Sequence, residues 1–241
     1  MAEAPIDTTA SAEEPAAKPR KSEQTKARIV DSALELFLEH GYDGTTMRAI
    51  AKAAGVSVGN AYYYFDSKEH LIQEYYGRVL DAHLEAARPA LARERTLQGR
   101  LRGVIRAHID TAAPYHQFAG VLFKTAADPK SPLSPFSNES GPTRERSIAL
   151  YTEALAGSDA KVAKELRADL PELLWLYQMG IVLYWVHDDS PGTERTYVLI
   201  DRTVPLVERL VSLTRLPVLR PIARQVIETM RELRGTPSAQ A

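Results

Sequence analysis

The chain has 241 residues, of which 44% are hydrophobic and 25% are charged, and its formal net charge is −1. This length fits one large domain or two modest ones, and a nearly neutral chain must attract a nucleic acid by local rather than total charge. The absence of cysteine excludes disulfides, thiol catalysis and thiolate metal sites. Because the sequence has neither a long apolar run nor an apolar signal-peptide core, we predict a cytoplasmic location.

Residues 1–21 are rich in Ala, Pro, Glu and Thr and lack hydrophobic periodicity, so we predict a disordered leader. The segment 18–28 is basic. A basic segment at this place can lie along DNA phosphates or can be a solvated linker, and the sequence leaves both alternatives open. A first helix is predicted over 22–40, where Ile29, Ala33 and Phe37 share one apolar face, and Gly41 ends it.

Two short helical patterns separated by one glycine follow within residues 45–65. Thr45 or Thr46 can cap the first helix, because a hydroxyl oxygen accepts an otherwise unpaired backbone N–H. Gly55 suits the left-handed residue that ends a helix, and Ser57 can cap the second. The pattern predicts a helix-turn-helix, whose second helix would enter a DNA major groove. The alternative is an αα-corner whose tyrosines pack inside.

The stretch from about Ala27 to Tyr76 resembles the DNA-binding domain of the TetR family of bacterial transcriptional regulators. Many fixed spacings agree at once. The matching residues are Ile29 to Ala33, Phe37, His40-Gly41-Tyr42, Thr45-Thr46, Ile50-Ala51, Ala54-Gly55-Val56-Ser57, Tyr62-Tyr63-Tyr64-Phe65, Ser67-Lys68-Glu69 and Leu71. One departure is Ala49, which stands where the family often has an acidic residue and so removes a reciprocal capping box.

The resemblance implies a set of DNA-contacting residues on and around the second helix of the motif. They are Thr45, Thr46, Arg48, Ser57, Val58, Gly59, Asn60, Tyr62, Tyr63 and Lys68. We expect Thr46, Tyr63 and Lys68 to contact phosphates, which position the protein without specifying sequence. Asn60 and Tyr62 are candidates for base edges, and Val58 for a thymine methyl group. Since this helix carries no arginine, we expect part of the specificity to come from DNA shape.

The rest of the chain is predicted to be helical, with no alternating strand pattern. A long helix begins at Lys68 and should end or kink near Ala87–Arg88, because Pro89 lacks an N–H. Further helices are expected over 96–113, 114–125, 143–155, 171–187, 193–216 and 221–234. Residues 128–142 have the composition of a mobile loop. We therefore predict an all-α protein with a helix-turn-helix domain at 22–68, a regulatory and dimerisation domain at 69–235, and a disordered tail at 236–241.

The segment 171–187 is apolar all round, which predicts a helix buried on all sides. Together with 193–216 it forms a helical hairpin, and we expect two copies of the chain to pair through about 171–216. A two-fold dimer reads a palindromic operator, with half-sites about 34–36 Å apart or a multiple of that distance. The alternative is that 171–187 is simply the centre of a monomeric bundle.

The resemblance implies a repressor that is released by a small-molecule effector. Candidate lining residues for its pocket are His83, His108, Tyr115, Phe118, Phe123, Tyr151, Trp175, Tyr177, Met179 and Tyr184. Aromatic side chains at helical spacing are equally typical of a core, and that alternative stays open. We expect no enzymatic activity, no metal and no cofactor besides the effector. A ligand-independent or activating regulator, or a helical protein-interaction module, are the alternative functions.

Overall fold

The computed structural model describes residues 21–163 and 166–214, together with the single positions 221, 225, 228, 229 and 232. Residues 1–20 of the predicted leader, the predicted tail at 236–241 and most of the predicted helix at 221–234 lie outside the described residues. The described part is helical and contains no strand, which confirms the all-α prediction.

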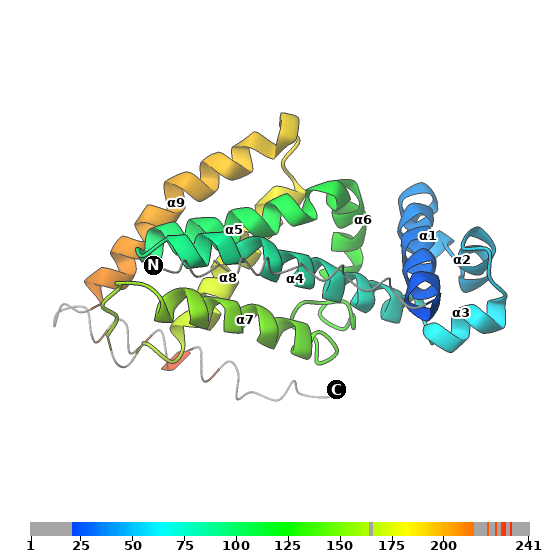
Figure 1. Cartoon of the computed structure of the whole chain (residues 1–241), viewed down its shortest axis with the longest axis horizontal. Helices are drawn as coiled ribbons and strands as arrows, with labels where there is room; N and C mark the ends of the chain where they lie inside the picture. Colours follow the sequence, from blue (N-terminus) through cyan, green and yellow to red (C-terminus); the bar gives the residue numbers. More distant parts are fainter. Residues whose placement is uncertain are drawn as a thin grey trace, which may run out of the picture.

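The head of the molecule, defined here as residues 21–65, consists of α1 (Lys21–Gly44), α2 (Met47–Ala53) and α3 (Val58–Tyr64). Gly41 has φ 75°, so the chain leaves regular helical geometry where the sequence predicted the end of the first helix. The side chains of Ile29, Phe37 and Ile50 are completely buried between the three helices. Figure 1 shows the head at one end of the molecule.

α4 (Lys68–Arg93) runs from the head into the rest of the molecule, and it continues straight through Pro89. The predicted end near Ala87–Arg88 is therefore wrong. Ala87 and Leu91, which flank the proline, are both buried, and α4 approaches α5 (Leu97–Ala112) so closely that a Cβ at Gly103 would lie 2.2 Å from Ala90 Cβ. This packing outweighs the hydrogen bond that a proline removes from a helix.

The body, defined here as α5 to α9, packs along α4, with α5 and α7 lying beside it (Figure 1). Its remaining helices are α6 (His116–Ala126), α7 (Gly141–Ala156), α8 (Leu170–Val186) and α9 (Glu194–Leu213). One hydrophobic core joins α4, α5, α7, α8 and α9, whereas a second core joins the head to α4, α6 and Leu133. Because residues on both sides of position 68 share the second core, the domain boundary at 68/69 stays a prediction.

The segment 128–140 follows α6 and is a loop, as predicted, but it is packed down onto α4. The side chain of Leu133 is completely buried, and Tyr76 donates its hydroxyl to the Leu133 carbonyl oxygen at 3.2 Å. Gln73 Nε2 donates to the Pro132 carbonyl oxygen at 2.9 Å. The loop thus ties the body to the part of α4 that lies nearest the head.

The hairpin of α8 and α9 is less buried in the single chain than an all-round apolar helix predicts. In the single chain α8 is not buried on all sides, because Leu183 and Tyr184 are 47% and 41% exposed. Thr193 has φ 54° and makes no side-chain cap. Asp188 stabilises the start of α9 instead, since its Oδ2 accepts from the backbone N and the hydroxyl of Thr196 at 2.8 and 2.7 Å.

Among the described helices, none combines the length and the hydropathy that crossing a bilayer requires.

Candidate nucleic-acid interface

Both helices of the helix-turn-helix begin with a local hydrogen bond that the sequence anticipated. Thr46 Oγ1 accepts from the Ala49 backbone N at 3.2 Å, and Ser57 Oγ accepts from the Asn60 backbone N at 3.1 Å. Gly55 between the helices has φ 65°, a conformation that costs a residue with a Cβ about 1 kcal/mol or more. These contacts fix the angle at which α3 projects from the head.

α3 turns one face into the head and the other into solvent. Ala61 of α3, and Phe65 directly after α3, are buried in the core that joins the head to α4 and α6. On the other side Tyr62 is 48% exposed, Tyr63 is 81% exposed, and Val58 is 37% exposed. The alternative of an αα-corner with its tyrosines inside is therefore wrong.

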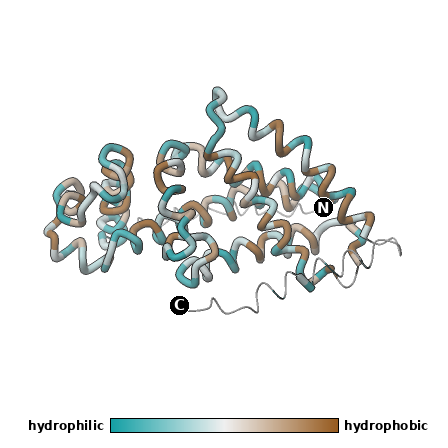
Figure 2. Tube along the Cα trace, turned by 180° about the vertical axis from the view of Figure 1, so that it is seen from behind, coloured by the Kyte–Doolittle hydropathy of each residue, from teal (hydrophilic) through white to brown (hydrophobic). Residues whose placement is uncertain are grey.

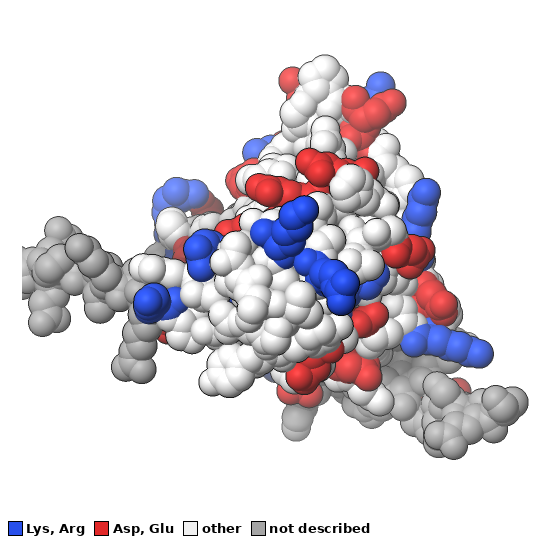
Figure 3. All heavy atoms as spheres, turned by 90° about the vertical axis from the view of Figure 1, so that its right-hand side faces the viewer, with Lys and Arg blue, Asp and Glu red and all other residues white. Residues whose placement is uncertain are grey.

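The exposed face of α3 carries no acidic side chain, and the predicted contact residues Ser57, Gly59 and Asn60 are exposed beside its tyrosines. Thr46 and Arg48 are exposed at the start of α2. Seen from the head's end of the molecule, basic and acidic side chains lie around a broad uncharged area (Figure 3). Such a surface can approach a phosphate backbone without like-charge repulsion at its centre, and its tyrosine and amide groups can form hydrogen bonds with DNA.

Thr45 is the exception among the ten predicted contact residues. Its side chain is only 2% exposed, and its hydroxyl lies 2.8 Å from the Gly41 carbonyl oxygen and 3.1 Å from the Leu36 carbonyl oxygen. The hydroxyl therefore stabilises the carbonyl end of α1 and is not available to DNA. We correct Thr45 from a contact residue to a structural residue of the head.

Lys68 begins α4 beside this face, and its ammonium group is held in place by Tyr42. Lys68 Nζ donates to the Tyr42 carbonyl oxygen at 2.6 Å and lies 4.2 Å from the centre of the Tyr42 ring. Sequence reasoning assigned no role to Tyr42, because it is 26 residues away from Lys68 and only the folded head brings the two together.

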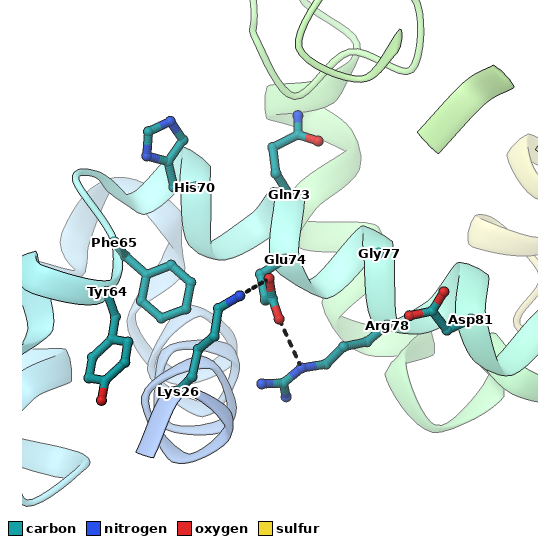
Figure 4. A pocket seen from close by; sticks show the side chains of 9 residues that line it. All are labelled: Lys26, Tyr64, Phe65, His70, Gln73, Glu74, Gly77, Arg78 and Asp81. Carbon is teal, nitrogen blue, oxygen red and sulfur yellow. Dashed lines mark hydrogen bonds and ion pairs between the residues drawn. The ribbon is translucent and has the colours of Figure 1, made fainter. Parts of the chain in front are cut away.

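A charged hollow of about 390 Å³ separates α1 from α4 on the side shown in Figure 4. Glu74 lies between two basic side chains, with its Oε2 2.6 Å from Lys26 Nζ and its Oε1 3.9 Å from Arg78 Nε. Arg78 also pairs with Asp31 of α1 at 3.0 Å. The pairs of Lys26 with Glu74 and of Asp31 with Arg78 connect the head to α4. No sequence signal predicted these two pairs, since their partners are 48 and 47 residues apart along the chain.

None of the ten predicted effector-contacting residues lines this hollow. His83 is buried and His108 is half-buried in the body, with their ring centres 4.8 Å apart. Burial lowers the pKa of His108 to about 3 and also lowers the pKa of His83, so both rings are neutral at pH 7.

The other predicted residues are distributed over several sites. Tyr151 donates to Gln178 inside the body, and Tyr177 bonds to Thr203 at 2.5 Å. Trp175 contacts the ring of Phe136, and Phe123 contacts that of His187. Met179 is half-buried in the body core, Tyr184 is exposed, and Tyr115 and Phe118 pack against Tyr75 of α4. The described structure therefore does not gather the ten residues around one cavity, and the effector pocket stays a prediction.

Comparison with known families matches the chain twice. The family described as bacterial regulatory proteins, tetR family, matches residues 29–75. The family described as tetracyclin repressor-like, C-terminal domain, matches residues 100–230.

Individual relatives match mainly the head. The probable HTH-type transcriptional regulator YttP of Bacillus subtilis is 46% identical over 56 residues, which are 22% of this chain and 27% of YttP. The biofilm operon icaADBC HTH-type negative transcriptional regulator IcaR of Staphylococcus aureus is 45% identical over 49 residues, which are 20% of this chain and 26% of IcaR. The matched region is thus about a quarter of the length of these relatives.

Solved structures match most of the chain at low sequence identity. The fatty acid degradation regulator FadR from Bacillus halodurans has a TM-score of 0.60 at 20% identity, covering 75% of this chain and 94% of FadR. A TetR-family regulator from Syntrophomonas wolfei has a TM-score of 0.62 at 15% identity, covering 78% of this chain and 96% of that one. At these identities the likeness concerns the fold alone.

Proposed function

We propose that this protein, which belongs to the tetR family of bacterial regulatory proteins, is a transcriptional regulator that binds double-stranded DNA through the exposed face of α3. The observation that carries this proposal is the orientation of α3. Its apolar residues Ala61 and Phe65 anchor it, and its uncharged polar face, with Tyr63 81% exposed, is left free. Thr46 caps α2 and Ser57 caps α3. A solvent-exposed helix face of this composition, on a helix held in this way, is suited to contact with a DNA major groove.

Residues that flank α3 divide into two classes by what they can contact. Thr46, Arg48 and Lys68 offer donors at the edges of the face, where phosphates would lie. Asn60 and Tyr62 project from α3 itself and are the candidates for base edges. The regulator would act in the cytoplasm, where its operator is accessible. We infer repression as its mode of action, because its relative IcaR is named a negative transcriptional regulator.

A single head reads too few base pairs for selective binding, so we infer a homodimer that forms through α8 and α9. Val198, Leu206, Leu210 and Leu213 are exposed on α9. They lie on one face, because they are spaced by eight, four and three residues, and Ile200, Val204 and Val211 occupy the opposite, buried face.

α9 thus has a buried apolar face and an exposed face on which these four apolar side chains lie together with Arg202, and the described residues cover only the first of the two. Hydrophobic residues recur along the helix (Figure 2), and Leu183 and Tyr184 add exposed apolar surface from α8. Exposed apolar surface of this extent is typical of a protein interface. A second copy of the hairpin, related by a two-fold axis, would cover it.

We further infer that an uncharged effector binds in the body. The His83 and His108 rings in the body are neutral. The indole N–H of Trp185 is buried and has no acceptor among the described residues. An effector with an acceptor oxygen would satisfy that N–H. To control the regulator it must bind the DNA-competent and DNA-incompetent conformations with different affinities. Thermal-shift screening combined with DNA titrations tests this inference, and it fails if no compound changes both melting temperature and DNA affinity.

The experiment that tests DNA binding is a fluorescence-anisotropy titration with a DNA fragment from upstream of the protein's own coding sequence, compared with random duplex at several salt concentrations. Lys68→Ala should weaken binding to all sequences alike and reduce the magnitude of the salt slope by about one per subunit, which is about two for the homodimer. Tyr62→Ala should change which operator variants are preferred. Lys124→Ala, which removes an exposed lysine of α6, is the control and should bind as wild type does.

Equal losses for Lys68→Ala and Tyr62→Ala on every sequence would contradict the two assigned roles. If the wild-type protein bound the upstream fragment no better than random duplex, the chain would not be a sequence-specific regulator of that region.

A further inference from the structure

α4 begins with two neighbouring side chains of opposite charge, Lys68 and Glu69. Both lie at the edge of the exposed face of the head, where the proposed DNA contact needs a positive charge. A flexible lysine and a flexible glutamate side by side would tend to neutralise each other, and a carboxylate near a phosphate would repel it. In the described structure the two side chains are not paired with each other, because each is held by a different part of Tyr42.

Tyr42 makes three contacts with this pair. Its backbone carbonyl oxygen accepts from Lys68 Nζ at 2.6 Å, and its ring lies 4.2 Å from the same ammonium group. Its hydroxyl donates to Glu69 Oε1 at 2.5 Å. The ring and the carbonyl attract the cation, while the hydroxyl at the far end of the ring attracts the anion. One residue therefore keeps the two charges apart.

We propose that Tyr42 is a positioning residue for DNA binding: it aims the Lys68 ammonium group at the phosphate backbone and holds the Glu69 carboxylate away from it. The proposal rests on the DNA-binding function proposed above. Lys68 has three N–H donors, of which the Tyr42 carbonyl uses one, so donors remain for a phosphate oxygen. Tyr42 itself donates its only hydroxyl hydrogen to Glu69 and needs no contact with DNA.

The surroundings of Tyr42 suit this role. Gly41, with its positive φ, turns the chain out of α1 immediately before Tyr42, and the Phe37 ring packs against the Tyr42 ring with centres 5.3 Å apart. Burial and the hydrogen bond to Glu69 raise the pKa of Tyr42, so that its hydroxyl stays a donor. Burial alone would raise the pKa of Glu69, but the hydrogen bonds from Tyr42 and Ser67, and to a smaller extent the charge of Lys68, lower it below its usual value, so that the carboxylate stays charged.

The test is the substitution Tyr42→Phe, which removes only the hydroxyl and keeps the ring and the carbonyl. Glu69 is then released and can neutralise Lys68. We expect binding to the upstream DNA fragment to weaken about tenfold, and the magnitude of the salt slope to fall by about two for a dimer, as one phosphate contact per subunit is lost. Tyr76→Phe is the matched control, because it also removes one tyrosine hydroxyl, which donates to the Leu133 carbonyl oxygen. This variant should bind DNA with the wild-type salt slope.

Two further variants distinguish positioning from a general structural role. In Tyr42→Phe/Glu69→Gln the released side chain carries no charge, so the affinity and the salt slope should return towards the wild-type values. Lys68→Met should weaken binding as Tyr42→Phe does, and combining the two should cause no further loss. A purely structural loss would not be rescued by Glu69→Gln.

The proposal is overturned if Tyr42→Phe retains the wild-type affinity and slope, or if the double variant with Glu69→Gln stays as weak as Tyr42→Phe. Circular dichroism and thermal melting establish that each variant is folded before its DNA titration. A wild-type protein that failed to bind DNA would refute the proposed function and this inference together, whereas a wild-type protein that binds with no effect of Tyr42→Phe refutes the inference alone.

Discussion

Asp188 at the start of α9 is the acidic residue whose loss should destabilise the hairpin most. Its Oδ2 accepts two hydrogen bonds from Thr196, and its Oδ1 accepts from the backbone N and the hydroxyl of Ser190 at 3.0 and 2.6 Å. The Asp188 and Thr196 side chains are both buried. The substitution Asp188→Asn keeps the shape of the side chain but removes its charge and one acceptor oxygen, as protonation of the carboxylate would.

Two independent arguments give a similar magnitude for the folding free energy that the Asp188 carboxylate contributes. Burial acts to raise the pKa of Asp188, but the hydrogen bonds from Ser190 and Thr196 outweigh it and lower the pKa from 3.8 to about 2. At about 1.4 kcal/mol per pKa unit, this difference corresponds to roughly 2 kcal/mol of folding free energy. Loss of an N-terminal helix cap costs about 0.5–2 kcal/mol, and an unsatisfied buried group about 1–3 kcal/mol.

The sign of the pH dependence follows from the depressed pKa. The stabilisation is fully present above pH 3.8, the ordinary value, and is lost as the pH falls towards 2. Urea unfolding at one fixed protein concentration should therefore give wild type an advantage over Asp188→Asn of about 2 kcal/mol at pH 7 and of about half that at pH 3. Comparing the two proteins at each pH cancels the titration of all other groups.

Asp189→Asn is the control, because the neighbouring Asp189 side chain is 88% exposed in its pair with Arg195 and should contribute less than about 0.5 kcal/mol. The reasoning is refuted if Asp188→Asn unfolds within about 0.5 kcal/mol of wild type at pH 7. It is also refuted if the difference between the two proteins stays constant from pH 7 to pH 3.

Two further predictions concern the body. The buried guanidinium group of Arg100 donates to four backbone carbonyl oxygens, those of Leu91, Glu94, Glu153 and Ala154, so Arg100→Met should lower the free energy of unfolding by about 3 kcal/mol in urea titrations. A loss below about 1 kcal/mol would show that water replaces the guanidinium group. Leu210→Glu places a charge on the exposed apolar face of α9, so light scattering at micromolar concentration should show the 26.7 kDa monomer. Ser212→Glu, on a different side of α9, should leave the dimer intact, and a wild-type monomer would refute the interface.

The head was predictable because its structure is determined by contacts between residues close together in the chain. The bonds from Ala49 N to Thr46 and from Asn60 N to Ser57 span three residues, and Gly55 needs only its own φ. The exposed face of α3 followed from the same local pattern. Thr45 was misassigned because its hydroxyl bonds back to α1, which a pattern of caps in the sequence does not reveal.

Pro89 and α8 show where local rules fail. The rule that proline ends a helix considers one chain segment alone, whereas the packing of α4 on α5 carries the helix on to Arg93. The sequence predicted that an all-round apolar helix would be buried on all sides, in part by a second copy of the chain. Within the single chain Leu183 and Tyr184 are exposed, whereas Trp175, Ile181 and Trp185 of the same helix are buried.

The sequence by itself determined the helical class, the helix-turn-helix with its caps and glycine turn, and the face of α3 that carries no acidic side chain. These depend on spacing along one chain and on the conformational preferences of single residues. Only the tertiary structure decided that Tyr42 separates Lys68 from Glu69, that Glu74 connects α1 to α4, and that the described residues leave Val198, Leu206, Leu210 and Leu213 of α9 exposed. Contacts of this kind join residues that are distant in sequence, and their energies arise only when folding places the partners within a few ångströms.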